Sequence, residues 1–246
     1  MKKVKNRIVI LLLVISVSQI SFAQKDILLG VKAGLSIPNL TSGSGGSPVS
    51  EGWSSREGPY FGAVAEFKQS KRFSFQIELN YSSQGGKKDG MQALPNPYGN
   101  NPQYVYANIN NETKLNYLEL PLLAKFYFPL GGNLSFFIDA GPYLGYLVAA
   151  KDVTSGTSNV YLDQAGTMPV TPQPISFDST QDVKSDIKKF NVGIQGAVGL
   201  CLKAGPGNLM LSAGGNYGFI PIQKDNSNGQ NNTGAATVTL GYLFKL

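Results

Sequence analysis

Residues Phe73–Tyr81 read FSFQIELNY and alternate apolar with polar side chains without a break. One side carries Phe73, Phe75, Ile77, Leu79 and Tyr81, and the other carries Ser74, Gln76, Glu78 and Asn80. Because successive side chains of a β-strand point to opposite faces, this period of two predicts a strand with one apolar and one polar face. The fold therefore depends on what each face meets.

The same alternation recurs along the chain and predicts seven further strands, at about residues 27–37, 59–67, 114–128, 134–148, 190–202, 209–219 and 235–246. Short turns alternate strictly with long segments that are rich in Gly, Pro, Asn and Ser. We expect the long segments to be loops, at about residues 38–57, 83–113, 150–187 and 221–234. An even number of strands with this alternation predicts an all-β, eight-stranded antiparallel up-and-down transmembrane β-barrel.

Composition agrees with a β protein that keeps much of its surface out of water. Charged residues make up 15% of the 246 residues, well below the usual quarter of a soluble domain, and Gly occurs 29 times. Without the four basic residues of the leader described next, 17 of the 21 basic residues remain against 15 acidic ones. This near balance gives no basis for a nucleic-acid-binding patch, and we expect no nucleic acid as a partner.

The first 23 residues have the pattern of a secretory signal peptide. A basic start precedes an apolar run from Ile8 to Val17, and Ser21-Phe22-Ala23 offers small residues at a cleavage site. The alternative, a membrane anchor, is disfavoured because this run is too short to span a bilayer. We expect residues 1–23 to be removed and residues 24–246 to form one exported barrel domain.

Alternation alone does not distinguish a membrane barrel from a soluble, lipocalin-like one. Here the polar face carries few charges and many small residues, which suits a narrow interior better than a solvated surface. Aromatic residues also gather near the strand ends, as they do at lipid interfaces. These observations favour the outer membrane, with interface girdles formed by Phe67, Phe73, Tyr81, Phe128, Phe136, Tyr146, Tyr217 and Phe244.

Six charged residues fall on the polar face, and we expect them to point inward as a structural charge network: Lys32, Glu66, Glu78, Glu119, Lys125 and Asp139. An eight-stranded barrel is only wide enough for side chains, and buried charges must be paired. We expect Glu119 and Lys125 to belong to one inward row with Glu78 as a neighbour. The alternative reading of these residues is a polar channel or proton path.

The residues give no support for catalysis. The chain has no His and a single Cys, which removes His-based general bases, Ser-His-Asp triads, Cys/His zinc sites and internal disulfides. We expect no enzyme activity, no catalytic residues, no cofactor and no metal, and we expect Cys201 to be a small interior residue. Recognition is more plausible in the long segments, whose aromatic residues are Trp53, Tyr98, Tyr104, Tyr106 and Tyr161.

The chain carries four motifs: GVKAGLS near the mature start, NYLELPLLAK at residues 116–125, DAGPYLGY at residues 139–146 and the terminal GYLFKL. Together these motifs resemble the PorT-like outer-membrane β-barrel family of Bacteroidetes-type bacteria. The resemblance covers nearly all of the mature chain. It implies the same fold and an outer-membrane location, and the family includes a factor linked to protein secretion.

The sequence thus predicts a non-enzymatic outer-membrane protein with a structural or surface-recognition role through four long outer loops and a lumen filled by side chains. Two alternatives stay open, an accessory factor for secretion or transport across the outer membrane and a narrow passive pore. The partners expected are outer-membrane lipid, the export and barrel-insertion machinery, and envelope or secretion proteins that contact the loops.

Overall fold

The computed structural model describes residues 26–42, 46–97, 99, 101–225, 227 and 229–246. The predicted signal peptide and Tyr98 lie outside the described residues. Eight long strands form the wall: β1 (Ile27–Ser42), β2 (Gly58–Lys68), β3 (Phe73–Pro95), β4 (Tyr104–Gly131), β5 (Leu134–Ser155), β9 (Phe190–Ala204), β10 (Gly207–Gly218) and β11 (Asn231–Lys245). Three short strands lie between β5 and β9, namely β6 (Thr157–Ser158), β7 (Ile175–Ser176) and β8 (Ser179–Asp182).

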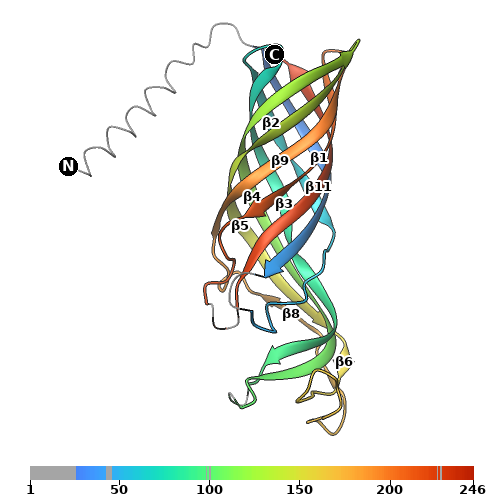
Figure 1. Cartoon of the computed structure of the whole chain (residues 1–246), viewed down its shortest axis with the longest axis vertical. Coiled ribbons are helices and arrows are strands. Elements are labelled where there is room, and N and C mark those ends of the chain that lie inside the picture. Colours follow the sequence, from blue (N-terminus) through green and yellow to red (C-terminus); the bar gives the residue numbers. More distant parts are fainter. Residues whose placement is uncertain (1–25, 43–45, 98, 100, 226, 228) are drawn as a thin grey trace, which may run out of the picture.

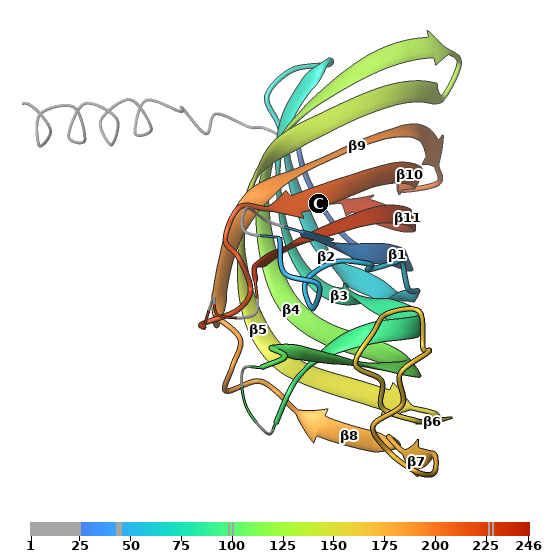
Figure 2. The same cartoon turned by 60° about the horizontal axis from the view of Figure 1, so that its bottom comes forward.

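The eight long strands close into a barrel. Each strand pairs antiparallel with its neighbour in sequence, β1 also pairs with β11, and the β4–β5 pairing completes the ring. Figure 1 shows the tilted strands with the C-terminus at the upper end, and Figure 2 shows the curved wall from the other end. This closure confirms the predicted fold. It also pairs the backbone of every wall strand on both sides, which a bilayer requires.

The two faces of the wall differ as the alternation predicts. Apolar side chains such as Val31, Leu79 and Leu240 point outward, and each is more than half exposed. Polar side chains on the other face, such as Glu78 and Asn80, are buried in the interior. In a soluble protein this outer surface would be a very large apolar patch, so its natural surrounding is lipid.

Glycines in the wall make room for large rings inside the barrel. Phe137 lies opposite Gly199 in register, and Tyr143 lies opposite Gly193. A Cβ atom added at either glycine would lie 2.6 Å from the facing ring, closer than real Cβ atoms come. The small residues of the polar face therefore do not leave a wide lumen, because aromatic side chains from the neighbouring strand occupy the space above them.

The expectation of an irregular loop over about residues 83–113 is wrong. β3 continues to Pro95 and β4 begins at Tyr104, with consecutive register pairs from Asn80–Glu119 to Pro95–Tyr104. We call Ser83–Pro95 together with Tyr104–Thr113 the outer arm; it extends beyond the barrel at the lower end in Figure 1. Its Pro and Asn residues suggested a loop, but all three prolines, Pro95, Pro97 and Pro102, lie at or within its tip.

The other long segments are also shorter than predicted, because the strands run past the apolar wall. β1 extends to Ser42, β5 extends to Ser155, and β11 begins at Asn231. β8 adds to the edge of β5, so the sheet of the outer arm continues across β5 to β8. These extensions of β1, β5 and β11 are mostly polar and lack a regular alternation of apolar and polar residues. The sequence pattern therefore did not reveal them.

The outer arm predicts a specific cross-link. In a protein with Cys201→Ser, we expect Ala93→Cys with Tyr106→Cys to form a disulfide, because these residues are register partners and opposite Cα atoms lie about 4.5–5.5 Å apart. Ala93→Cys with Asn108→Cys is the control, since its diagonal spacing of about 7–8 Å is too long. Non-reducing electrophoresis of the inserted protein measures both, and equal cross-linking of the two pairs would indicate an irregular loop.

Candidate functional site

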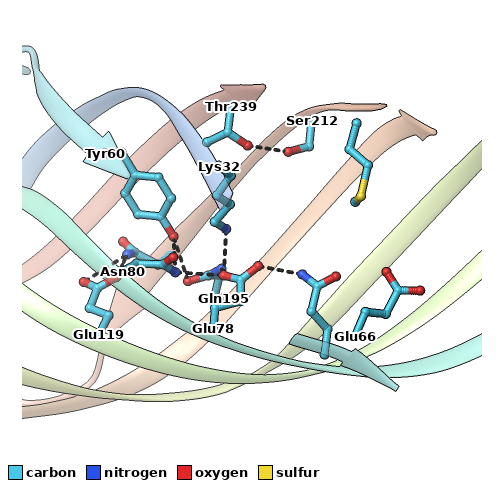
Figure 3. A network of polar contacts seen from close by, with 12 residues as sticks. Lys32, Tyr60, Glu66, Glu78, Asn80, Glu119, Gln195, Ser212 and Thr239 are labelled. Atoms are coloured by element: carbon cyan, nitrogen blue, oxygen red, sulfur yellow. Dashed lines mark hydrogen bonds and ion pairs between the residues drawn. The ribbon is translucent and has the colours of Figure 1, made fainter. Parts of the chain in front are cut away.

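The interior of the barrel is organised around the Glu78 carboxylate on β3. Lys32 on β1 approaches it to 2.6 Å, and the side-chain amides of Gln76 and Asn80 donate hydrogen bonds of 2.6 and 2.7 Å. Gln195 on β9 donates a fourth, at 3.3 Å. Figure 3 shows Lys32 of β1 and Gln195 of β9 meeting Glu78 of β3, with Asn80 beside it. A carboxylate with one cation and three amide donors is satisfied without water, so it cross-links the wall through the lumen.

Tyr60 fills the space next to this carboxylate. Its hydroxyl accepts a hydrogen bond from Asn80 at 2.8 Å and lies 3.5 Å from the Gln195 oxygen, to which it donates. The Lys32 ammonium lies 5.0 Å from the centre of the Tyr60 ring, within the range of a cation–π contact. The tyrosine thus joins β2 to the same network (Figure 3).

A second group of charges lies toward the short turns. Lys125 and Glu66 are both fully buried, and their charged atoms are 3.5 Å apart. Lys68 lies 3.3 Å from Glu66, and the Tyr127 hydroxyl donates to both Glu66 oxygens at 2.8 Å. Lys125 also donates to the Gln76 oxygen at 2.9 Å, which connects this group to Glu78.

Glu119 and Lys125 both point inward from β4, but they have different partners. Glu119 accepts hydrogen bonds from Asn216 at 3.1 Å and Gln84 at 3.3 Å, and the described residues place no cation in a salt bridge with it. Glu119 therefore lies in a separate amide-lined group toward the long loops. Glu119 and Lys125 thus share the inward face of β4, with Glu78 near Lys125 through Gln76, but the three residues differ in their direct partners.

Asp139 is buried next to Lys125 in register and lines an interior cavity of about 30 Å³. The cavity is also lined by Lys32, Glu78 and the hydrogen-bonded pair Ser212–Thr239. Its volume corresponds to about one water molecule. A cavity of this size does not form a continuous passage through the barrel.

Apolar side chains close the barrel at both ends. We call the buried cluster near the short turns the inner cluster; it comprises Leu28, Val64, Tyr127, Phe137, Cys201, Met210 and Leu243. The outer cluster lies at the long-loop end and comprises Leu40, Leu115, Tyr117, Leu147, Ala150, Ile187 and Ile222. Glu66 lies at the level of the inner cluster, since Leu28 is its register partner and Tyr127 donates to it, and the side chain of its partner Lys68 is 24% exposed.

The mouth on the long-loop side is held by contacts outside the apolar wall. Arg56 binds Glu112 at 2.7 Å and Ser83 at 2.9 Å, and Lys114 approaches Glu112 to 3.0 Å. Partial burial raises the pKa of Glu112, but the hydrogen bonds from Arg56 and Lys114 outweigh it, so the pKa lies below its usual value. Arg56 stands in an irregular segment, where no sequence pattern marks it as functional.

Lys88, which belongs to the outer arm, contacts the segment that contains Trp53. Its ammonium lies 4.5 Å from the Trp53 ring and donates to the Val49 carbonyl at 2.5 Å. Burial lowers the pKa of Lys88 to about 8, although Asp152 and Glu51 act in the opposite direction.

The predicted girdle residues lie on the outer surface of the barrel, beside other aromatic rings. Toward the short turns, the ring centres of Phe73 and Phe126 are 4.8 Å apart, and those of Phe128 and Phe136 are 6.1 Å apart. The remaining neighbours are Phe67–Phe75 in register, Tyr242–Phe244, Phe61–Tyr81, Tyr146–Phe190 and Tyr217–Phe219. Six of the seven pairs contain one ring that was not predicted as a girdle residue, and only Phe128–Phe136 has two predicted members.

The described part of the chain contains no cluster of three or more potential metal-ligating side chains. Within the same residues, no helix is both long and apolar enough to cross a membrane.

The Glu78 network predicts the effect of removing its cation. Lys32→Met leaves a buried carboxylate without its charge partner, and we expect the free energy of unfolding to fall by about 3–5 kcal/mol. Replacing both residues, as Lys32→Met with Glu78→Met, should recover most of this loss. Lys245→Met is the control, because its ion pair with Asp26 is half-exposed on both sides and is worth at most about 1 kcal/mol. Unfolding by urea in lipid vesicles measures all three, and equal losses for Lys32→Met and Lys245→Met would refute a structural role for the network.

Three solved structures are similar to this chain at low sequence identity. OprG from Pseudomonas aeruginosa is 8% identical with a TM-score of 0.42, and the alignment covers 91% of this chain and 98% of OprG. Neisserial surface protein A is 14% identical with a TM-score of 0.40 and coverages of 89% and 97%. Ail from Yersinia pestis is 10% identical with a TM-score of 0.38 and coverages of 90% and 100%. These values are too low to transfer a role.

A search of curated proteins found no match. The model of one protein family, described as the outer membrane protein beta-barrel domain, matches residues 22–224, which is most of the chain. Together with the closed eight-stranded wall and its apolar outer face, this match shows that the chain is an outer-membrane protein and belongs to the outer membrane protein β-barrel domain family.

Proposed function

We propose that this protein is a non-enzymatic, plugged barrel that anchors a recognition surface on the outside of the cell. The observation that carries the proposal is the combination of a lumen closed by side chains with a sheet that continues beyond the barrel. Because the interior offers no path for a solute, a partner outside the cell would bind the outer arm and the segments packed on it.

The outer arm has a small core of its own, which supports a rigid role. Val105, Ala107 and Ile109 on β4 are buried outside the apolar wall. Tyr161 pairs through its backbone with Tyr106, and the Ser158 hydroxyl accepts a hydrogen bond from the Asn108 amide. The segment after β5 is thus held against the arm. Recognition surfaces on rigid scaffolds commonly use such segments.

This segment also exposes apolar side chains to water. Leu162, Met168, Val170 and Ile175 are each 41–55% exposed, and all four lie between β6 and β8. A turn holds their spacing, since Asp163 accepts hydrogen bonds from the backbone amides of Thr167 and Met168. We call these four residues the apolar tip. Exposed apolar residues gathered on an ordered segment favour a binding site for another protein.

The chemistry of the chain supports a role without catalysis. There is no His in the sequence, and the buried carboxylates are held by amides, lysines and a tyrosine inside a closed space. A substrate has no route to them, and nucleophilic catalysis needs an accessible nucleophile next to a base.

A strain lacking the gene tests this proposal. It is complemented with the wild type, with a tip variant (Leu162→Ser, Met168→Ser, Val170→Ser and Ile175→Ser) and with a matched control (Ser176→Ala, Thr180→Ala and Gln181→Ala). We expect the tip variant to insert normally but to lose at least about 30-fold in partner binding, measured by cross-linking on intact cells, because such anchors contribute about 2 kcal/mol or more. The control should behave like the wild type.

Two other outcomes have clear meanings. Full complementation of envelope integrity by the tip variant would contradict recognition through the tip and favour a purely structural barrel. A loss of secreted proteins in the strain, with normal detergent resistance, would favour the accessory role in secretion that the resemblance to the PorT-like family implies.

A further inference from the structure

We propose that the outer wall of the barrel carries a binding site for a phosphate-bearing, acylated lipid of the outer leaflet. Two independent features of the surface lead to this inference. One is a hollow in the apolar wall, and the other is a pair of lysines that face each other beyond its outer end. The site is separate from the apolar tip and does not depend on the proposed function.

The hollow has a volume of about 700 Å³ and opens on the lipid-facing side. It forms where Ala33 on β1 and Ala63 on β2 point outward beside larger neighbours. Phe61 and Tyr81, whose rings stack at 5.0 Å, and Leu118 on β4 are among the residues that border it. Its lining is apolar, so the part of a ligand that it accepts is a hydrocarbon chain.

The lysine pair lies farther along β4 in the direction of the outer arm. Lys114 is four residues from Leu118 on the same face of the strand, a distance of about 13 Å along the chain. It stands directly opposite Lys151 of β5 in the register of the sheet. Like charges in this arrangement destabilise a sheet unless an anion lies between or above them.

The local acidic residues do not neutralise this pair completely. Glu112 lies 3.0 Å from Lys114, but it is also bound by Arg56 at 2.7 Å. Asp182 of β8 is the register partner of Lys151. Two cations therefore share Glu112, and the described residues show no ion pair between Lys151 and Asp182. The Lys114 side chain remains 40% exposed, and Lys151 is exposed.

The arrangement matches the two parts of an anionic lipid. Tyr81 and Leu118 are register partners at the edge of the hollow toward the outer arm, so the lysines lie just outside the apolar wall, where lipid phosphates are found. Lysine side chains also bend back toward such a boundary. An acyl chain in the hollow would place its own headgroup within reach of Lys114 and Lys151, and free phosphate would use only half of the site.

The experiment measures the retention of phosphorylated lipid A by the barrel in neutral detergent, using native mass spectrometry. Lys114→Gln with Lys151→Gln should weaken binding about 25-fold, because each lysine near an anionic lipid contributes about fivefold. Ala63→Leu, which fills the hollow, should weaken it as well. Ala213→Leu on β10 is the matched control, since Ala213 is equally outward and exposed but does not border the hollow, and it should have no effect.

Each alternative result overturns the proposal. If the lysine variant binds like the wild type, the charges have no role. If Ala63→Leu and Ala213→Leu behave alike, the hollow is not the site. If millimolar inorganic phosphate displaces the lipid, the site recognises the free anion. All the substitutions are on the outer surface, and the heat-induced shift on electrophoresis checks that each variant is folded; Lys114→Gln alone provides a milder second variant.

Discussion

The buried carboxylate of Glu78 and the donors that surround it set the main constraint on this barrel. An eight-stranded wall leaves a lumen only as wide as its own side chains, and a charge placed there must be satisfied from within. Lys32, Gln76, Asn80 and Gln195 do this from three strands, so the network holds opposite sides of the wall together. The aromatic rings over Gly193 and Gly199 then fill the remaining space.

This constraint divides the molecule into an interior that stabilises and an exterior that can interact. The outward side chains of the wall meet lipid, and the inner and outer clusters close the two ends. Beyond the wall, the same strands continue as the outer arm, which carries its own buried residues. A partner, whether protein or lipid, therefore meets the outer surface, and the stiffness of the closed barrel keeps that surface in a fixed geometry.

The sequence predicted the wall well because its period of two reports directly which side chains face lipid. It placed Glu78, Glu119 and Lys125 on the inner face for the same reason. Their partners depend on the register between distant strands, so the contact of Glu78 with Gln195 on β9 had no local signal. The outer arm was missed although Val105, Ala107 and Ile109 alternate with polar residues on β4, because the paired part of β3 has no such period and the residues around Pro95 and Pro102 resemble a loop.

The reactivity of Cys201 tests most directly whether the lumen is closed. It is the single cysteine of the chain and lies buried in the inner cluster. In proteoliposomes, a charged thiosulfonate added to both sides should leave Cys201 unlabelled while the barrel is folded and label it completely in denaturant. A Cys201→Ser protein with Asn133→Cys in an exposed turn is the control and should react at once. Labelling of folded Cys201 at the rate of this control would show that water and ions enter the lumen, which would contradict a barrel filled by its own side chains.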